Sequence, residues 1–334
     1  MVDKQTITRP LEAVICSDDL TIEHIRAAAA RLDGVAHRTP LVTSVTLDSD
    51  CGAAVVLKAE SFQRSGSFKF RGAYNRLSQL DPAGRAGGVV AYSSGNHGAA
   101  VALAARLLGI AAVIVVPATG SPAKLAAISG YGAELRRYDP VTERREEVAA
   151  AVAQERSLTI IRPFDDYEIM AGQGTTGLEL AQDVADLDQV LVPVGGGGLS
   201  AGVSTAVKAL QPRASIIGVE PTGGGDTSAS MRAGHRVNIG EPSTIADGLR
   251  ASQPGELTFP INEKLLDDVV TVADEEIVEA MRFCFARLKI VIEPSGAVAL
   301  AALRAGLVPA ARRVGVVLSG GNIDPADFAA LLAS

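Results

Sequence analysis

The chain alternates between short apolar runs rich in valine and isoleucine and alanine-rich stretches with helical spacing. The apolar runs have the length of buried strands, and the alanine-rich segments favour helices that cover them. The predicted strands are residues 54–59, 88–93, 111–116, 158–163, 189–194, 215–220 and 314–319, and the predicted helices are 97–109, 122–132, 146–155 and 295–306. This alternation is typical of an α/β protein with mostly parallel sheets that are buried on both faces.

Length and charge restrict the class of protein further. With 334 residues the chain is long enough for two domains or one large one. No apolar run reaches the roughly 20 residues that a membrane span needs. The N-terminal segment carries charges of both signs and does not have the pattern of a targeting peptide. The net charge is −7, whereas nucleic-acid-binding proteins generally have a basic surface. We therefore expect a cytoplasmic protein that acts on a small molecule, without a nucleic-acid or membrane partner.

The cysteines and most histidines indicate neither disulfides nor a zinc site. Cys16, Cys51 and Cys284 are odd in number and far apart, which favours isolated thiols. The scattered histidines, His24, His37 and His235, lack zinc-like spacing.

A glycine turn follows the predicted strand 189–194. Gly195, Gly196, Gly197 and Gly198 remove every β-carbon from this turn, so that successive N–H groups can converge on an anion at the start of the next helix. A phosphate fits that place, although a tight turn without a ligand is the simpler alternative. The turn matches neither a dinucleotide fingerprint nor a P-loop.

Two more turns and one lysine complete the set of candidate functional residues. Ser93, Ser94, Gly95, Asn96 and His97 lie between a strand and a helix, where hydroxyls, an amide and free N–H groups can meet a carboxylate. Ser319 ends the last apolar run, and Lys69 stands between Phe68 and Phe70. The set suits a phosphate-bearing aldehyde cofactor held by a lysine as a Schiff base.

These segments resemble a known family, the pyridoxal-phosphate enzymes of the serine/threonine dehydratase and serine racemase group, which have fold type II. The resemblance extends through "SFKFRGA", "SSGNHG", "PFDDYEIMAGQGTTGLEL", "VPVGGGGLSAG", "TIADGL", "EPSGAVALAA" and "LSGGNID", in family order. It implies two open, twisted, mostly parallel sheets covered by helices. It also implies a large cofactor-binding domain, residues 1–75 and 158–334, and a small domain, residues 76–157.

The resemblance further implies a role for each site residue. Lys69 would carry pyridoxal 5′-phosphate and act as the base at Cα, while Asn96 would bind the 3′ oxygen of the cofactor. Gly195 to Gly198 would hold the phosphate, and Ser319 would face the pyridine nitrogen. Phe68 would pack near the ring, with simple core packing as the alternative. Ser93, Ser94, Asn96 and His97 would receive the substrate carboxylate.

The expected reaction is the dehydration and deamination of L-threonine, L-serine or a related 3-hydroxy amino acid, as in the ammonia-lyases of class EC 4.3.1. A serine or other amino-acid racemase with side dehydratase activity is an alternative, because Ser94 matches the second proton donor of the racemases. A third alternative is a 3-hydroxyaspartate dehydratase, because Arg145 aligns with an arginine that contacts a dicarboxylate. Arg145 is equally well explained as a surface charge, and Ala251 stands where the racemase has a ligand-contacting serine. A cofactor-binding protein without catalysis is the non-enzyme alternative.

The resemblance also implies a divalent cation and an oligomer. Glu220 and Asp226, with the carbonyl of Gly224 between them, have the spacing of a Mg²⁺ site that also takes Ca²⁺ or Mn²⁺. Two solvated acids are the alternative. The expected assembly is a homodimer or homotetramer. The C-terminal amino-acid-sensing domain of biosynthetic threonine dehydratases has no counterpart in this sequence.

Overall fold

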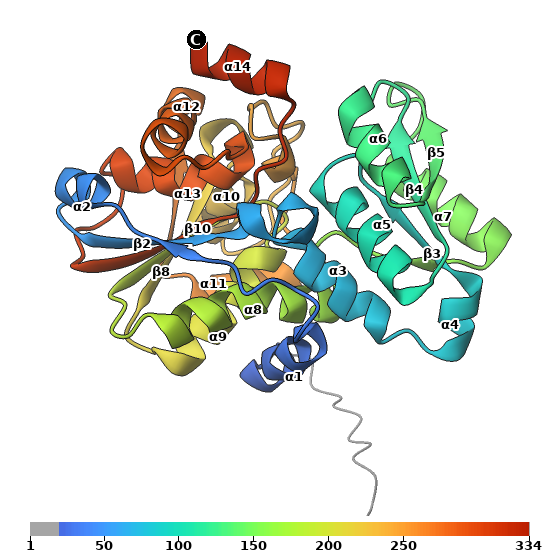
Figure 1. Cartoon of the computed structure of the whole chain (residues 1–334), viewed down its shortest axis with the longest axis horizontal. Coiled ribbons are helices and arrows are strands. Elements are labelled where there is room, and N and C mark those ends of the chain that lie inside the picture. The colour runs from blue at the N-terminus through green and yellow to red at the C-terminus, as the bar shows by residue number, and fades with distance from the viewer. Residues whose placement is uncertain (1–19, 334) are drawn as a thin grey trace, which may run out of the picture.

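The computed structural model describes residues 20–333, which form two sheets covered by helices (Figure 1). Cys16 and the first 19 residues of the predicted large domain lie outside this part. The first sheet has the order β1-β2-β10-β7-β8-β9 and the second β5-β4-β3-β6. Their bounds are β1 Leu41–Val42, β2 Ala54–Ala59, β3 Val89–Tyr92, β4 Ala112–Pro117, β5 Glu134–Tyr138, β6 Thr159–Ile160, β7 Gln189–Pro193, β8 Ser215–Pro221, β9 Asp268–Val272 and β10 Arg313–Leu318.

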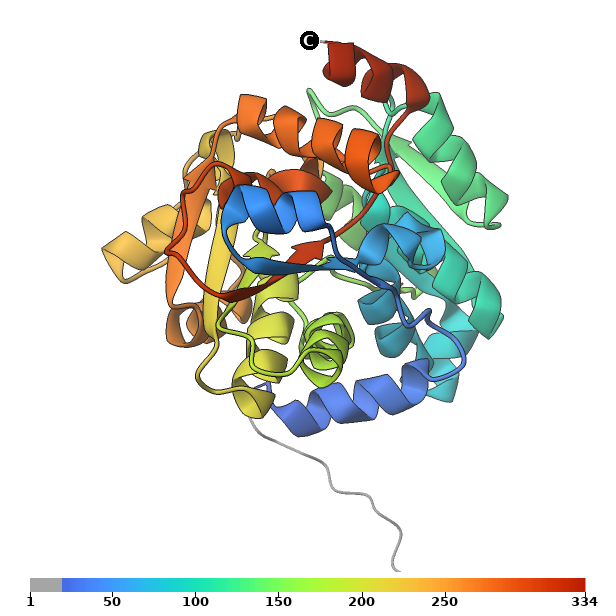
Figure 2. The same ribbon diagram turned by 60° about the vertical axis from the view of Figure 1, so that its left-hand side comes forward.

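The first sheet is parallel except for β1, which pairs antiparallel with β2. Its centre is apolar because β10 lies between β2 and β7, with Val316 opposite both Leu57 and Leu191. All three of these side chains are buried. In the turned view of Figure 2 the orange helices α12 (Asp274–Phe283) and α13 (Pro294–Arg304) lie on one side of this sheet. Helices α8 (Tyr167–Asp183) and α9 (Gly198–Leu210) lie on the other side.

The second sheet is parallel throughout and lies on the right in Figure 1. Helices α3 (Lys69–Ser78), α5 (Asn96–Leu108) and α6 (Pro122–Gly130) pack on one face, and α7 (Arg145–Arg156) packs on the other. The remaining helices are α1 Ile22–Leu32, α2 Val45–Cys51, α4 Pro82–Gly87, α10 Asp226–Ala233, α11 Thr258–Leu265 and α14 Pro325–Ala333.

The predicted fold class is confirmed, since the sheets are mostly parallel and helices cover both faces. Each of the seven predicted strands overlaps an observed strand, and the four predicted helices are α5, α6, α7 and α13. Strands β1, β5 and β9 are additional. The second sheet is built from residues 89–160, close to the predicted small domain, whose exact division from the large domain stays a prediction.

Four charged side chains form a buried network of opposite charges: Lys58, Glu60, Arg71 and Glu179. Arg71 on α3 donates to Glu60 at 2.8 Å and to Glu179 on α8 at 2.7 Å. Lys58 on β2 donates to the second oxygen of Glu179 at 2.6 Å. The pairing cancels two positive against two negative charges, which is what burial of charge requires. It ties the start of α3 to the sheet and to α8.

Within residues 20–333, none of the helices is both long enough and apolar enough to cross a membrane.

Candidate active site

One cavity of about 430 Å³ lies where the loops after the strands of both sheets meet. It is lined by Lys69, Phe68, Ser93, Ser94, Asn96, His97, Arg145, Gly195, Gly196, Gly197, Gly198 and Ser319. The structure therefore brings together the residues expected to carry catalysis, the cofactor and the substrate. Glu220, Gly224 and Asp226 do not line this cavity.

Lys69 is the first residue of α3, and its side chain reaches the cavity wall. The amine donates a hydrogen bond of 2.7 Å to the carbonyl of Pro163 and lies 5.2 Å from the centre of the Phe68 ring. No carboxylate of residues 20–333 forms an ion pair with it. Burial lowers the pKa of Lys69 to about 8, because few groups offset the loss of water around the charge. The amine therefore loses its proton readily.

The glycine turn leads from β7 into α9 and presents N–H groups to the cavity. The carbonyl of Gly196 accepts from the hydroxyl of Thr258 at 2.7 Å, and the carbonyl of Gly197 accepts from the amide of Asn262 at 3.1 Å. Since C=O and N–H point in opposite directions across a planar trans peptide, the next N–H groups point away from these partners. The turn therefore fits an anion such as a phosphate at the start of α9.

The turn also needs glycine for steric reasons. A β-carbon on Gly196 would lie 2.4 Å from the ring of Phe164, and Gly197 has φ of +91°. Phe164 lines the same cavity, and nothing in the sequence pattern singled it out. Phe164 lies close to both Gly196 and Gly198, which favours glycine at these two positions.

The turn Ser93 to His97 precedes α5, which begins at Asn96. The first N–H groups of a helix lack intrahelical acceptors, so this end suits a carboxylate. His97 is buried, and its Nε2 donates to the carbonyl of Ile161 at 3.1 Å. Burial and the nearby charge of Lys69 lower the pKa of His97 to about 3. The imidazole is therefore neutral, and the group of His97 that suits an anion is its backbone N–H at the helix start.

Another part of the cavity wall contains Asn96, Ser319 and a residue that sequence reasoning missed, Glu293. The amide nitrogen of Asn96 donates to Glu293 at 2.6 Å, and Ser319 Oγ approaches the carbonyl of Ser295 at 3.4 Å. Ser319 is buried at the end of β10, and its carbonyl accepts from the N–H of Phe68 at 3.1 Å. The strand end thus fixes the backbone next to Lys69. The segment "EPSG" at the start of α13 was visible in the sequence, but its side-chain direction was not.

Two arginines lie at the rim. Arg145 begins α7, with its side chain about half exposed and its Nε 2.8 Å from Glu146. Arg250 also lines the cavity and donates to the carbonyl of Thr244 at 3.0 Å. Lys124 and Asp247 pair at 2.5 Å across the same opening. The rim therefore holds more positive than negative groups.

The proposed cation ligands lie in a separate place, at the end of β8 and the start of α10. Glu220 is fully buried and accepts from the N–H groups of Thr227 at 2.9 Å and Ser228 at 2.7 Å. Both oxygens of Asp226 are buried and lack a hydrogen-bond partner within the described part of the chain. Burial raises the pKa of Glu220, and burial together with the Glu220 charge raises that of Asp226. No group of three or more His, Cys, Asp or Glu side chains suited to a metal occurs among residues 20–333.

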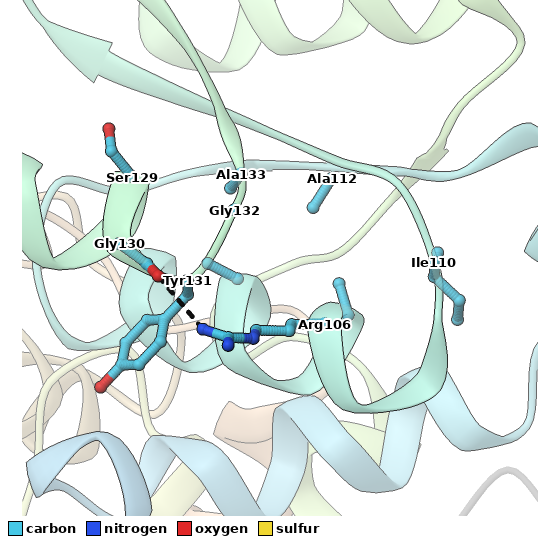
Figure 3. Close-up of a pocket in the computed structure, with 10 residues that line it drawn as sticks. Arg106, Ile110, Ala112, Ser129, Gly130, Tyr131, Gly132 and Ala133 are labelled. Carbon is cyan, nitrogen blue, oxygen red and sulfur yellow. Dashed lines mark hydrogen bonds between the residues drawn. The ribbon is translucent and has the colours of Figure 1, made fainter.

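A second pocket of about 410 Å³ lies among α5, α6 and β4 and contains none of the expected site residues (Figure 3). Arg106 is the only charged side chain in its wall, and it donates to the carbonyl of Gly130 at 3.2 Å. This pocket lacks the chemistry of the first.

Comparisons with known proteins agree with this site. A family model described as pyridoxal-phosphate dependent enzyme matches residues 32–320. The chain is 47% identical over 307 residues to L-threo-3-hydroxyaspartate ammonia-lyase of a Pseudomonas species, over 91% of this chain and 96% of the relative. It is 42% identical to serine racemase of Schizosaccharomyces pombe, over 95% of this chain and 99% of the relative. The solved structure of maize serine racemase superposes with a TM-score of 0.90 at 40% identity, over 94% of this chain and 97% of that one.

The chain therefore belongs to the pyridoxal-phosphate dependent enzymes, in the group that includes serine racemases and 3-hydroxy amino-acid ammonia-lyases. The resemblance and the fold type II assignment are confirmed. The N–H groups of the glycine turn suit a phosphate, and the amine of Lys69, which has no ion-pair partner among residues 20–333, suits an aldehyde; both groups belong to that cofactor.

Proposed function

We propose that this chain is an ammonia-lyase that converts a 3-hydroxy amino acid to a 2-oxo acid and ammonia. The observation that carries the proposal is the single cavity in which an easily deprotonated lysine, an anion-binding glycine turn and a helix start for a carboxylate meet. Pyridoxal phosphate, when bound, supplies an aldehyde for the amino group and withdraws electrons from Cα.

The residues of the chain supply position and proton transfer. The glycine turn and the start of α9 hold the phosphate, and Lys69 holds the cofactor through its amine. The N–H groups at the start of α5 orient the substrate carboxylate, which leaves Cα facing the lysine. Once the amino group of the substrate has displaced Lys69 from the cofactor, the freed neutral amine of Lys69 would take the proton from Cα and pass it to the departing 3-hydroxyl, which leaves as water. Hydrolysis of the resulting enamine would consume one water and release the 2-oxo acid and ammonia. The neutral hydroxyl of Ser319 places no negative charge at the ring nitrogen.

The substrate class is narrowed by the charges at the rim. Arg145 and Arg250 line the cavity and can attract a second carboxylate on the substrate. The Pseudomonas relative carries the name of a 3-hydroxyaspartate ammonia-lyase. We therefore expect L-threo-3-hydroxyaspartate to be turned over more efficiently than serine, threonine or phenylserine, as measured by 2-oxo acid release.

Arg145→Ala should raise KM for the dicarboxylate at least about tenfold, a loss of about 1.4 kcal/mol, and should leave KM for serine nearly unchanged. Equal effects on both substrates would contradict the role of Arg145.

The central test is Lys69→Ala, with Lys208→Ala as a matched control, since Lys208 pairs with Asp267 away from the cavity. We expect Lys69→Ala to lose the visible absorbance of bound cofactor and at least about 10³-fold in turnover. Lys208→Ala should keep both. A Lys69→Ala variant that retains the absorbance and the activity would overturn the proposal. Wild-type chain that binds the cofactor without turnover of any 3-hydroxy amino acid would favour a cofactor-binding protein.

A racemase is the second candidate function, and Ser94 is the observation that favours it. Ser94 lines the same cavity as Lys69, so its hydroxyl is available as a second proton donor. Chiral analysis of recovered serine would reveal racemisation. We expect Ser94→Ala to reduce racemisation far more than 2-oxo acid production. An equal loss of both would assign Ser94 to carboxylate binding instead.

We further propose that Glu220, Asp226 and the carbonyl of Gly224 bind Mg²⁺, or Ca²⁺ or Mn²⁺ in its place. The support is the buried, unpartnered carboxylate of Asp226 beside Glu220, because hard cations take carboxylate and carbonyl oxygens with water completing the shell. Added Mg²⁺ should raise Tm in the wild type and in Asp268→Ala, a control on the exposed part of β9, but not in Asp226→Ala. If neither chelator nor added Mg²⁺ changed the Tm of the wild type, this result would argue against the site.

We also propose that the chain assembles as a homodimer or homotetramer and acts in the cytoplasm. Phe62 and Val291 are each about half exposed, and Val291 and Ser61, the residue before Phe62, both lie next to Gly321, so an apolar surface is available for a second copy. The free thiols of Cys51 and Cys284 suit a reducing compartment. Light scattering of the purified chain and cell fractionation would test the two proposals, and a monomeric mass or a secreted protein would refute them.

A further inference from the structure

Glu293 is a buried acid in the cavity wall to which the proposed mechanism gives no role. Only 3% of its surface is exposed, and it stands just before Pro294, the first residue of α13, without a side-chain hydrogen bond to the helix start. Asp247 is the only other acid in the cavity lining. A buried carboxyl at a ligand site needs a physical reason, because removing it from water is costly.

The partners of Glu293 explain what it holds in place. Its Oε1 accepts from the amide nitrogen of Asn96 at 2.6 Å. The amide oxygen of Asn96 in turn accepts from Asn322 Nδ2 at 2.8 Å, and the same nitrogen donates to the carbonyl of Ser65 at 2.6 Å. Because a carboxyl oxygen accepts and Asn322 donates, the network assigns which end of the Asn96 amide faces which partner. One N–H of that amide remains for a ligand.

The carboxyl also packs against the strand end that carries Ser319. A β-carbon on Gly320 would lie 2.2 Å from Glu293 Oε1 and 3.3 Å from Asn96 Nδ2. The residue after Ser319 must therefore be small so that the carboxyl can reach Asn96. Asn96 and Ser319 are the two residues expected to meet the cofactor ring. Glu293 contacts Asn96 directly and packs beside Gly320, the residue after Ser319.

The charges around Glu293 suit a neutral acceptor. Burial, and then the nearby Asp247, raise the pKa of Glu293 to about 8, while Asn96, Lys124 and the N–H of Asn322 act in the opposite direction. Near neutral pH the carboxyl is therefore mostly uncharged. It can accept from Asn96 without placing a full negative charge beside the cofactor.

We propose that Glu293 is a positioning residue that fixes the Asn96 carboxamide in the orientation that leaves its second N–H for the cofactor. It thereby increases the affinity of the chain for pyridoxal phosphate. This inference rests on the proposed function, since Asn96 matters here only as a cofactor contact.

The test is equilibrium binding of pyridoxal phosphate to the full chain after removal of any cofactor. The sequence has no tryptophan, so equilibrium dialysis and the visible absorbance of bound cofactor are the suitable readouts. Glu293→Ala and Glu293→Met, which keeps the volume but offers no comparable acceptor, should each raise Kd about tenfold or more. Glu293→Gln retains an acceptor oxygen and should stay within about threefold of the wild type.

A double-mutant cycle separates positioning from general structural damage. In an Asn96→Ala background, Glu293→Met should add almost nothing to the loss, because the two residues act through one contact. Glu276→Ala is the control: the Glu276 carboxylate accepts from the N–H of Ala273 at the start of α12, but Glu276 does not line the cavity. This control should leave Kd unchanged.

The outcomes also separate this inference from the function on which it rests. Wild-type Kd in Glu293→Met, or an undiminished loss in the Asn96→Ala background, would overturn the role of Glu293 while the ammonia-lyase proposal stands. Wild-type chain that shows no visible band with pyridoxal phosphate would instead refute the proposed function. If Glu293→Ala fails to fold, the comparison of Glu293→Met with Glu293→Gln decides.

Discussion

At the scale of single residues, Lys69 is notable for the partner that it has. The acceptor of its amine is the carbonyl of Pro163, not a carboxylate. A carboxylate would stabilise the ammonium and keep the amine protonated, whereas a carbonyl in a buried site does so much less. Lys58, which is fully buried, pairs with Glu179 and so remains structural. The two lysines show how the partner separates a reactive amine from a stabilising charge.

This difference predicts the pH dependence of cofactor capture by the cofactor-free chain. Only the unprotonated amine reacts with an aldehyde, and burial lowers the pKa of Lys69 to about 8. The rate of capture should therefore rise with pH and level off above about pH 8, whereas an ordinary lysine would continue to gain up to about pH 10.4. Stopped-flow absorbance measures this rate. Lysine acetylated on its α-nitrogen, which keeps a free ε-amine, serves as a reference that corrects for ionisation of the aldehyde itself. A rate that rises in parallel with the reference would contradict the lowered pKa.

At the scale of elements, the start of α9 and the loop at Phe164 depend on each other. The Phe164 ring covers Gly196, and a methyl group there would lie 2.4 Å from it. We expect Gly196→Ala to weaken pyridoxal phosphate binding about tenfold or more, because the N–H groups of the turn would be displaced. Phe164→Ala combined with Gly196→Ala should recover part of the affinity by restoring space. Equilibrium dialysis of the three variants tests this, and a double variant as weak as Gly196→Ala would show that the clash is not the cause.

Helix α3 offers a second comparison between two arginines on one element. Arg71 is buried with Glu60 and Glu179, whereas Arg76 pairs with Asp166 and is about one quarter exposed. Arg71→Met leaves buried carboxylates without their partner and should reduce the free energy of unfolding by about 3–5 kcal/mol. Arg76→Met, the control, should cost no more than about 1 kcal/mol. Urea unfolding gives both values, and equal losses would show that burial of the network is not what matters.

The elements that were predicted from sequence are those in which burial dominates. Strands such as β7, with all five residues buried, appear as continuous apolar runs. Strand β5 reads Glu134–Tyr138, "ELRRY", lies at the edge of its sheet and is largely exposed, so its pattern resembles a loop. The Asn96 to Glu293 hydrogen bond joins residues 197 positions apart. Local patterns identified Asn96 as a candidate but carry no information on such a long-range partner.

At the scale of the whole molecule, the cavity belongs to both sheets. Asn96 and Lys124 come from helices on the second sheet, whereas Glu293 and Asp247 come from segments that pack with the first. The bonds Asn96 to Glu293 and Lys124 to Asp247 therefore cross the site. The exposed Lys124 pair is worth little by itself, so the buried contact at Glu293 is the more consequential of the two.

The buried carboxyl at this junction should make global stability depend on pH. The folded chain raises the pKa of Glu293 to about 8 from an ordinary value of 4.5. Between these values the folded chain keeps a proton that the unfolded chain releases, so stability falls as pH rises. Glu293→Gln cannot titrate and lacks this dependence, while Asp247, Lys124 and the other ionisable groups are common to both proteins. The Tm of the cofactor-free wild type should therefore fall relative to that of Glu293→Gln from about pH 5 to about pH 8. Parallel Tm curves for the two proteins would mean that Glu293 is ionised in the fold, and that its bond to Asn96 joins the two halves of the site as a full charge.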